Sequence, residues 1–471
     1  MTLSTQEKVG VRERLYKTSA STESESDPDE ASASPVELGL DDALKIAIEL
    51  HQNRQYEGAE ELYRRILGIV PEHPDALHFL GMLQHQRGAS DEGIALIEQA
   101  ARRAPGFAGF HNNLGNIHAS RGDVPAATAA YEHALALAPE SADLHNNLGA
   151  LYRADDRFAD ARAAYQRAIA LDPEHLTSHN NLGLLHAAEG DLQGAVGYYC
   201  KALELMPGHP DGRKLLGMTY YTMGKIKEAA EVFRQWRADA PEHPVANHMY
   251  AASSGEGVPE RAPDNYVEYT FDRFADSFET QLNDRLHYQA PQLCAAMLAR
   301  HLPAPVKQFV ILDAGCGTGL CGPLVKQWAC ALAGVDLSRG MLDHARTKGV
   351  YTDLYKAELT EFLRESPGQW DVLLSADTLC YFGDLHAVMA AAGVAARASA
   401  TLVLTVEALA ESSPLPFHLE PHGRYAHSQA HVREALAACG FEVIEITQET
   451  LRQEGGKPVR GWLVAARRTA G

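Results

Sequence analysis

A period of 34 residues governs the first half of the chain and constrains its fold more than any other feature. Four classes of residue keep this period: a proline, a Leu-Gly pair, a small residue and an aromatic residue four positions after it. The prolines are Pro71, Pro105, Pro139, Pro173, Pro207 and Pro241, and the glycines are Gly81, Gly115, Gly149, Gly183 and Gly217. Chance does not hold four registers over six periods, so we expect stacked copies of one structural unit.

Each period fits a pair of helices, because small residues let two helices approach and proline ends the second helix. The period and its Leu-Gly, Ala, aromatic and Pro positions resemble the tetratricopeptide repeat. This resemblance implies an all-α solenoid over residues 40–250. We expect about six repeats, at 40–73, 74–107, 108–141, 142–175, 176–209 and 210–243. The first repeat has Ile46-Ala47 in place of Leu-Gly, as an end repeat often does.

The segments on either side of the repeats lack their pattern. Residues 1–39 alternate serine with acidic residues between Ser24 and Glu30, and they offer too little apolar surface to offset the entropy of ordering. We therefore expect a disordered tail there. Residues 251–263 hold the run Ser-Ser-Gly-Glu-Gly-Val-Pro and are expected to be a linker. Residues 264–471 are then the second domain.

Short β-rich runs alternate with helical stretches in residues 264–471, which is typical of a parallel sheet covered by helices. The expected strands are 309–313, 331–336, 353–357, 371–375, 401–406, 441–446 and 461–467. Seven strands in this arrangement fit an α/β doubly wound, Rossmann-like domain.

The segment Phe309–Gly319 predicts a ligand site. A buried strand ends at Asp313, and a Gly-x-Gly-x-Gly turn follows it and opens a helix. Glycine lets the backbone approach a ligand without a Cβ in the way. A dinucleotide-binding fingerprint is the main alternative, but its required last glycine falls on Leu320.

Acidic residues end the next strands in turn. Asp336 lies 23 residues after Asp313, where a carboxylate can accept hydrogen bonds from both ribose hydroxyls. Glu358 follows the third strand, beside the place an adenine ring would occupy, and Asp377 follows the fourth. A ribose alone does not separate a methyl donor from a dinucleotide, so the order of all these elements carries the inference.

In this order the elements resemble a class I S-adenosylmethionine-dependent methyltransferase, over roughly residues 265–468. The family's sheet ends in an antiparallel hairpin, for which 441–446 and 461–467 are the expected strands. The whole arrangement resembles bacterial predicted methyltransferases that carry tetratricopeptide repeats. The resemblance implies S-adenosylmethionine as the cofactor, whose ammonium and sulfonium groups favour a nearby carboxylate such as Asp313.

The resemblance also implies a role for each motif residue. Residues of the segment Asp313–Gly319 would contact the methionine part of the cofactor, and Asp336 would contact the ribose. Glu358 and Leu359 would meet the adenine edge, and Asp377 would lie near the reacting centre. The complete expected cofactor-binding set is Asp313, Gly315, Cys316, Gly317, Gly319, Asp336, Leu337, Glu358, Leu359 and Asp377.

Other residues are candidates on the substrate side. An aromatic stretch from Tyr266 to Phe278 is either a helix that covers the cofactor or a helix whose aromatic residues are only core. The segment 412–431 is dense in His, Arg and Tyr, and we select Arg424 and Tyr425 in it for substrate contact. Methyl transfer needs positioning more than a dedicated base. If a base exists, the candidates are Asp377, Tyr381, His422 and His427.

Three consecutive repeats contain the motif His-Asn-Asn-Leu-Gly, at 111–115, 145–149 and 179–183. If Asn113, Asn147 and Asn181 line the concave face, their amides can hydrogen-bond the backbone of an extended peptide. The alternative is that these amides pair only with neighbouring helices. The expected partner is therefore a protein or peptide on the concave face.

Composition excludes several other classes. The net charge of −20 disfavours a general basic surface for nucleic acid. We expect no membrane span, because no window holds 18 uninterrupted apolar residues, and no secretory signal. Seven scattered cysteines form neither a disulfide framework nor a metal site with zinc spacing. These features predict a cytoplasmic protein without a metal.

Three functions stay open at this point. The first is a methyltransferase whose repeats recruit a protein or peptide as substrate or scaffold. The second is a methyltransferase of small-molecule biosynthesis whose repeats serve assembly, and the sequence does not separate it from the first. The third is an interaction scaffold with a vestigial methyltransferase fold, which the intact glycine turn and Asp336 disfavour. The acceptor, the atom methylated and the oligomeric state do not follow from the sequence.

Overall fold

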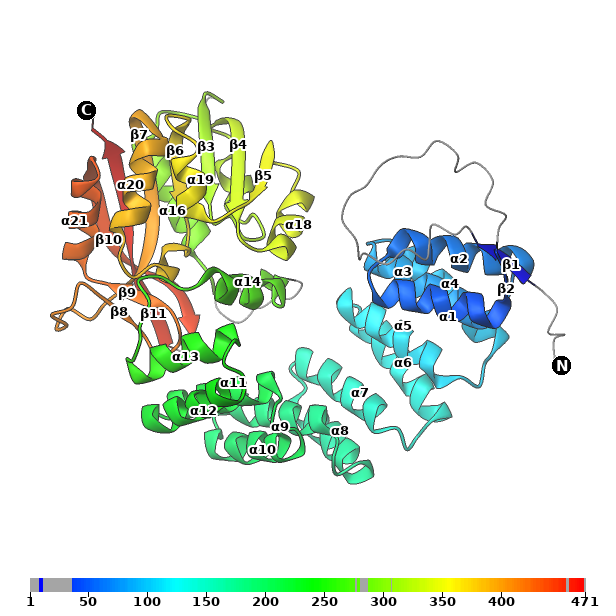
Figure 1. Cartoon of the computed structure of the whole chain (residues 1–471). Helices are drawn as coiled ribbons and strands as arrows, with labels where there is room; N and C mark the ends of the chain where they lie inside the picture. The colour runs from blue at the N-terminus through cyan, green and yellow to red at the C-terminus, as the bar shows by residue number, and fades with distance from the viewer. Residues whose placement is uncertain are drawn as a thin grey trace. The chain divides into compact units, whose positions relative to one another are not determined.

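The computed structural model describes residues 8–11, 36–275, 278–279, 287–305, 307–454 and 457–469. Contacts divide the chain into two compact units, Met1–Pro207 and Gly208–Gly471. Figure 1 shows the helices of the first unit and the helices and sheet of the second. Each unit is described by itself below.

Consecutive helices of the first unit pair as the repeat pattern predicts. They are α1 (Leu40–Gln52), α2 (Tyr56–Ile69), α3 (Pro74–Gln86), α4 (Ser90–Arg103), α5 (Ala108–Ser120), α6 (Val124–Leu137), α7 (Ala142–Ala154), α8 (Phe158–Leu171), α9 (Leu176–Ala188) and α10 (Leu192–Leu205). Each periodic proline follows the end of the second helix of a pair by two residues, as Pro71 follows Ile69. The predicted helical solenoid is confirmed.

The glycine of each Leu-Gly pair lies against the aromatic residue of the same repeat in several repeats. A Cβ added at Gly115 would lie 2.5 Å from the ring of Tyr131, and one added at Gly149 would lie 2.7 Å from the ring of Tyr165. Both rings are buried. The glycine therefore makes room on the first helix for the aromatic side chain of the second, which explains why the two positions recur together.

Two short strands lie within the segment 1–39, which the sequence predicts to be disordered. They are β1 (Lys8–Val11) and β2 (Val36–Gly39), and they pair antiparallel, with Lys8 opposite Gly39. The remaining residues of that segment lie outside the described residues.

The second unit begins with the sixth repeat, α11 (Pro210–Thr222) and α12 (Ile226–Asp239), and with α13 (Pro244–Ser254). Helix α13 packs on α14 (Asp264–Asp272), where the His248 ring stacks on Tyr266 with centroids 3.9 Å apart. His248 Nε2 also lies 2.8 Å from the carbonyl oxygen of Gly423. The repeat pattern predicts a boundary in the linker 251–263. The contacts instead divide the chain between Pro207 and Gly208.

The second unit contains a twisted sheet in the strand order β10-β11-β7-β6-β3-β4-β5. Its strands are β3 (Phe309–Ala314), β4 (Ala329–Asp336), β5 (Asp353–Lys356), β6 (Trp370–Ser375), β7 (Ala396–Ala408), β10 (Phe441–Glu454) and β11 (Lys457–Arg468). Strands β3 to β7 are parallel, and β11 is antiparallel to both β7 and β10. All seven expected strands and the doubly wound fold are confirmed.

The insertion 412–431 adds two further strands, β8 (Phe417–Leu419) and β9 (Tyr425–His427), which the sequence analysis did not expect. They pair antiparallel with each other, and β9 continues in parallel beside the end of β7. Leu419 and Tyr425 are buried together with Ala251 and Ala252 at the end of α13. The insertion therefore holds the sixth repeat region against the sheet.

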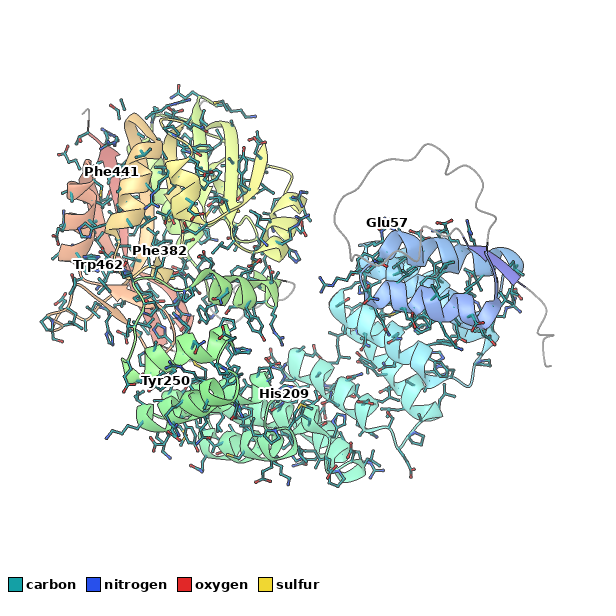
Figure 2. The ribbon with its side chains drawn as sticks, viewed as in Figure 1. Glu57, His209, Tyr250, Phe382, Phe441 and Trp462 are labelled. Carbon is teal, nitrogen blue, oxygen red and sulfur yellow. The ribbon has the colours of Figure 1, made fainter. Side chains whose placement is uncertain are left out.

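Helices cover both faces of the sheet, because successive residues of a buried parallel strand point to opposite faces. Leu312 of β3 packs with α19 (Leu359–Arg364), α20 (His386–Ala395) and α21 (Gln429–Ala438). Its neighbour Ile311 packs with α16 (Ala290–His301) and α17 (Gly322–Val325). Phe441 and Trp462, labelled in Figure 2, belong to the first of these cores.

No helix in the described part of the chain is both long enough and apolar enough to cross a membrane.

Candidate functional site

A cavity of about 560 Å³ opens in the second unit at the carboxyl ends of the parallel strands. Its lining includes the glycine turn with the tips of β4, β5 and β6, the helix α14 with residues after it, and residues of the sixth repeat and α13. Arg424 and residues of β10 also line it. Ligands of doubly wound folds bind outside the carboxyl ends of the strands. The cavity is therefore the candidate site.

Most of the expected cofactor-binding residues line this cavity. Those that do are Gly315, Cys316, Gly317, Asp336, Leu337, Glu358, Leu359 and Asp377. Asp313 and Gly319 are not among the lining residues. Gly319 has φ 84°, and a Cβ there would lie 2.9 Å from the ring of Tyr351, so this glycine serves packing beneath the turn.

Asp313 lies near the end of β3 and is buried. Its side chain is only 1% exposed, and Tyr351 donates a hydrogen bond to Asp313 Oδ2 at 2.6 Å. Burial raises the pKa of Asp313 to about 7. In this structure Asp313 Oδ2 is therefore paired with Tyr351, and a contact of Asp313 with a ligand stays a prediction.

Asp336 lies at the tip of β4 and holds the glycine turn while it faces the cavity. Its Oδ2 accepts a hydrogen bond from the backbone N of Gly317 at 2.9 Å, and its Oδ1 accepts one from Ser338 N at 2.8 Å. Burial raises the pKa of Asp336. A carboxylate has about four acceptor positions, so each oxygen keeps one for a ligand.

Glu358 has one oxygen in use and one without a hydrogen bond. Its Oε2 accepts from Glu361 N at 2.9 Å and so caps α19. Its Oε1 is buried and has no hydrogen-bond partner, and the nearest cation, Arg261 Nη1, is 3.8 Å away. A buried acceptor without a partner costs free energy, and a ligand N–H in the cavity would remove this cost.

Asp377 lies after β6 in a strained conformation. Its φ is 58°, in the left-handed region that non-glycine residues rarely adopt. The backbone N of Asp377 donates to Thr405 Oγ1 at 2.8 Å, and Arg452 Nη1 donates to Asp377 Oδ2 at 2.5 Å. The other oxygen, Oδ1, is buried without a hydrogen bond. Neighbouring groups thus hold a carboxylate oxygen in place at the cavity wall.

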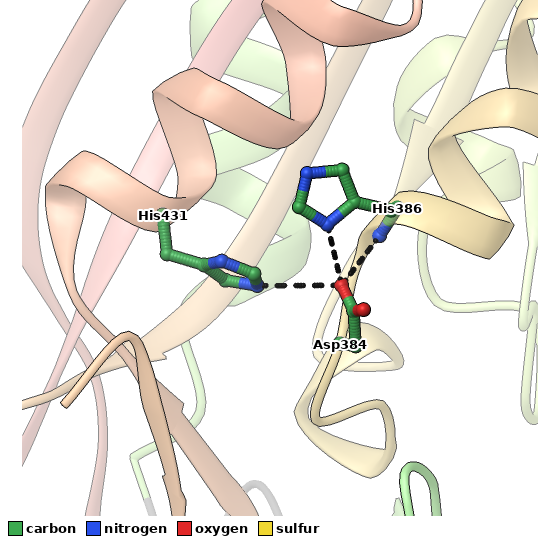
Figure 3. A group of neighbouring side chains, drawn as sticks. All are labelled: Asp384, His386 and His431. Atoms are coloured by element: carbon green, nitrogen blue, oxygen red, sulfur yellow. Dashed lines mark hydrogen bonds and ion pairs between the residues drawn. The ribbon is translucent and has the colours of Figure 1, made fainter.

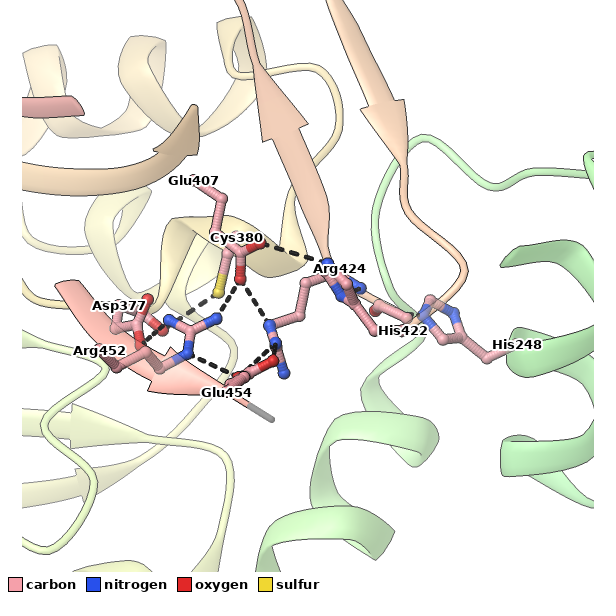
Figure 4. A network of polar contacts seen from close by, with 9 residues as sticks. His248, Asp377, Cys380, Glu407, His422, Arg424, Arg452 and Glu454 are labelled. Carbon is pink, nitrogen blue, oxygen red and sulfur yellow. Dashed lines mark hydrogen bonds and ion pairs between the residues drawn. The ribbon is translucent and has the colours of Figure 1, made fainter. Parts of the chain in front are cut away.

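Asp377 belongs to a network of ion pairs that is largely buried (Figure 4). Arg452 is 3% exposed and contacts Asp377, Glu407 and Glu454, while Arg424 donates to Glu407 at 2.5 Å and to Glu454 at 2.6 Å. The arginines lower the pKa of Glu407 to about 2 although its burial opposes this. Sequence reasoning missed Glu407, Arg452 and Glu454, although a glutamate in the apolar run of β7 was a signal.

The expected substrate and base residues divide between the cavity and the core. Arg424 and Tyr381 line the cavity, whereas Tyr425, His422 and His427 are not among its lining residues. Tyr425 is fully buried and donates to the carbonyl of Pro259 at 2.6 Å. Burial lowers the pKa of both histidines to about 4. Tyr425 and the two histidines are thus parts of the packed insertion.

The aromatic stretch 266–278 contributes both to a core and to the cavity wall. Tyr266 is 7% exposed and packs in a core with Met249 and Trp236. On another face of the same segment, Val267, Thr270 and Phe271 line the cavity, and so do Phe274 and Phe278 after the helix. The segment is a core element on one side and a cavity wall on the other.

The sixth repeat also supplies part of the wall, which sequence reasoning did not foresee. Pro210, Asp211 and Lys214 of α11 line the cavity together with Trp236 of α12 and Val245 of α13. Arg273, the residue that ends α14, is 3.1 Å from Asp211. Repeats carry no sequence signal of a contact with a distant sheet, so only the fold could reveal this wall.

The asparagines selected for peptide binding make hydrogen bonds between repeats. Asn147 Nδ2 donates to Asn112 Oδ1 and Asn181 Nδ2 donates to Asn146 Oδ1, each at 2.9 Å. Asn113 Nδ2 lies 2.6 Å from His78 Nε2. These contacts match the alternative in which the amides pair with neighbouring helices.

One cluster outside the cavity lining has metal-ligand side chains: Asp384, His386 and His431 (Figure 3), whose ligand atoms lie within 4.8 Å of one another. Asp384 Oδ1 accepts from the backbone N of His386 at 3.0 Å and lies 2.6 Å from its Nδ1. This pattern is that of a carboxylate at the start of α20. The sequence analysis, which expected no metal site, did not single out this cluster.

Comparison with known families matches both parts of the chain. Tetratricopeptide repeat families match residues 50–114, 107–174, 146–212 and 186–252, and a methyltransferase domain family matches residues 311–397. Methyltransferase-like protein 27 of Homo sapiens is 34% identical over 128 residues, which are 27% of this chain and 51% of the relative. The chain thus spans about half the length of that relative.

Two further proteins are similar to part of this chain. Ubiquinone biosynthesis O-methyltransferase of Rhizobium etli is 26% identical over 180 residues, which are 35% of this chain and 72% of the relative. A solved structure of an S-adenosylmethionine-dependent methyltransferase, described as putative, from Listeria monocytogenes has a TM-score of 0.31 and 19% identity. It covers 38% of this chain and 99% of that one.

Proposed function

We propose that this chain, which joins tetratricopeptide repeats to a methyltransferase domain, transfers methyl groups from S-adenosylmethionine. The observation that carries the proposal is the pair of carboxylates on the cavity wall. Asp336 keeps free acceptor positions at the tip of β4, and Glu358 presents an oxygen without a partner. An adenosine offers matching donors, namely two ribose hydroxyls and one exocyclic amine.

The donor set fits a methyl donor better than a dinucleotide. Leu320 lines the cavity at the place where a dinucleotide fingerprint requires its third glycine. The cavity also holds Asp377 Oδ1, a buried carboxylate oxygen without a hydrogen bond, which can accept a hydrogen bond from a ligand but has none to donate to a pyrophosphate. When bound, S-adenosylmethionine supplies an activated methyl group on a sulfonium. Asp336 and Glu358 would hold its nucleoside, and Gly315 and Gly317 would let the backbone approach its methionine part.

The residues present serve positioning more than proton transfer. In-line displacement of a methyl group requires the acceptor to be held close and aligned. Asp377 and Tyr381 line the cavity and can orient an acceptor there. His422 and His427 are less suited to act as a base, since neither lines the cavity and burial lowers the pKa of each to about 4.

The enclosure of the cavity favours a small acceptor. Its volume of about 560 Å³ has to hold both the cofactor and the acceptor, which leaves room for one small molecule or one side chain. A relative named ubiquinone biosynthesis O-methyltransferase supports the small molecule. The repeats of the first unit then serve to bind a protein, as tetratricopeptide repeats generally do.

Calorimetric titration of the full chain with S-adenosylmethionine tests the proposal. Asp336→Ala should weaken binding by roughly 1.5–3 kcal/mol, because hydrogen bonds to a charged acceptor are lost. Asp343→Ala is the matched control, since it removes an exposed carboxylate from the neighbouring α18 (Arg339–Thr347). Equal binding by both variants, or a wild type that prefers a nicotinamide dinucleotide, would refute the proposal.

A further inference from the structure

The cations that line the cavity differ in one respect, the presence of a carboxylate partner. Four of them are paired: Arg261 with Asp264 at 2.5 Å, Arg273 with Asp211 at 3.1 Å, Arg424 with Glu454 at 2.6 Å and Arg452 with Asp377 at 2.5 Å. The fifth, Lys214 of α11, makes no hydrogen bond or ion pair with a described residue. Its charge is therefore available to a ligand.

The surroundings of Lys214 keep this charge unpaired. Asp211 lies one helical turn earlier, where it could pair with Lys214, but both of its carboxylate oxygens accept hydrogen bonds from Arg273. Lys214 lines the cavity and is exposed on one side, yet desolvation by surrounding atoms lowers the pKa of its ammonium group. A partly desolvated ammonium gains more from an anionic partner than a fully hydrated one does.

Lys214 differs from the residues at the equivalent position of the preceding repeats. The same register position holds Asn112, Asn146 and Asn180 in the three preceding repeats. Asn112 and Asn146 accept hydrogen bonds from the next repeat. In the sixth repeat an ammonium replaces this amide and lines the cavity instead. The wall beside it is apolar, with Trp236 and Val245 from the repeat side and Phe271 from α14.

We propose that Lys214 binds an anionic group of the methyl acceptor, a carboxylate or a phosphate, and that the sixth repeat thereby selects the substrate. The class of acceptor is a small molecule with an apolar, flat body and one anionic group. This inference rests on the proposed methyltransferase function. It assigns substrate recognition to residues outside the matched methyltransferase segment, 311–397.

Binding of three matched probes to the full chain tests the inference: benzoate, phenyl phosphate and the uncharged benzamide. Each is titrated calorimetrically with and without saturating S-adenosylhomocysteine. At least one anion should bind about tenfold more tightly than benzamide, the scale of one charge-assisted hydrogen bond. Lys214→Met should abolish this preference and leave benzamide binding unchanged. The preference for benzoate or for phenyl phosphate identifies the anionic group.

Lys227→Met is the matched control, because Lys227 is an exposed lysine of α12 that does not line the cavity. This variant should keep the preference for anions. A wild type without such a preference, or a Lys214→Met variant that retains it, overturns the inference. So does a Lys214→Met variant that binds S-adenosylhomocysteine weakly but 5′-methylthioadenosine normally, since Lys214 would then contact the cofactor's carboxylate.

The same titrations separate this inference from the proposed function. If the wild type fails to bind S-adenosylhomocysteine, the methyltransferase proposal fails, whereas the anion preference measured without that ligand still decides the role of Lys214. Thermal unfolding of Lys214→Met should match that of the wild type, because Lys214 makes no ion pair with a described residue.

Discussion

The sixth repeat and the five repeats before it share one sequence pattern but lie in different compact units. In both regions a glycine on the first helix makes room for an aromatic ring on the second, as Gly149 does for Tyr165 and Gly217 for Phe233. The first five repeats belong to the unit Met1–Pro207, whereas helices α11 to α13 belong to the same unit as the sheet, Gly208–Gly471. The comparison teaches that the repeat motif determines how the two helices of a repeat pack. The residues outside the motif determine whether the repeat also lines a ligand site.

Truncation gives the largest expected effect. A fragment 208–471 should unfold cooperatively and bind S-adenosylmethionine, whereas 264–471 should lose roughly 5 kcal/mol or more of stability. The reason is that Trp236, Val245 and Met249 are buried in one core with Tyr266, and each large apolar side chain contributes roughly 1.5–3 kcal/mol. Thermal and urea unfolding of both fragments measure the difference. Equal stability would place the sixth repeat outside the catalytic unit.

Removal of Arg452 tests the network within the catalytic unit. Arg452→Met should cost about 3–5 kcal/mol, because the buried Glu407 and Asp377 lose a partner. Arg460→Met, on the exposed part of β11, is the control and should change stability by less than about 1 kcal/mol. Urea unfolding decides, and similar losses in both variants would show that the network contributes little.

The pKa of Asp313 predicts how stability depends on pH. Because the folded-state pKa is about 7 and the ordinary value is 3.8, folding favours the protonated carboxyl. Stability from this group is therefore present below about pH 4 and is lost as pH rises to about 7, by roughly 2–4 kcal/mol. Asp313→Asn keeps an acceptor for Tyr351 and should flatten this slope. An unchanged slope in the variant would contradict the account.

Alanine at the repeat glycines compares the two regions directly. Gly217→Ala and Gly149→Ala should each cost about 1–3 kcal/mol, since the added Cβ meets the ring of Phe233 or Tyr165. Only Gly217→Ala should also weaken acceptor binding, because α11 lines the cavity. Unfolding and binding are measured on the same samples. Impaired acceptor binding in Gly149→Ala would erase the distinction between the regions.

The smallest expected effect concerns the asparagines of the first unit. Asn147→Ala should lower the stability of that unit by about 1 kcal/mol, the net value of one hydrogen bond. Cofactor affinity should not change. If Asn147→Ala is as stable as the wild type but loses a bound peptide, the amide serves peptide binding as the sequence analysis expected.

Periodic and sequential signals predicted the helix pairs and the seven strands, because both depend on spacing along the chain. The same signals singled out Asp336, the last residue of β4, and Glu358, two residues after β5; their contact with a cofactor stays a prediction. These signals did not predict the contact of Asp313 with Tyr351, which spans 38 residues and depends on packing. Glu407 and Arg452 were missed because they pair with residues distant in sequence, and Lys214 was missed because its place in the cavity wall depends on the fold. Contacts between distant segments are the part that spacing cannot reveal.

Hydrogen–deuterium exchange of the full chain with and without S-adenosylhomocysteine tests the central claim most directly. We predict that S-adenosylhomocysteine slows exchange at the glycine turn 315–319 and at the tip of β4 around 336–338. Exchange along 210–217 of the sixth repeat should slow once benzoate or phenyl phosphate is added as well. Exchange in helices α3 to α9 should not change. Protection that spares the glycine turn, or that appears in the repeats of the first unit and not in the sixth, would contradict this prediction.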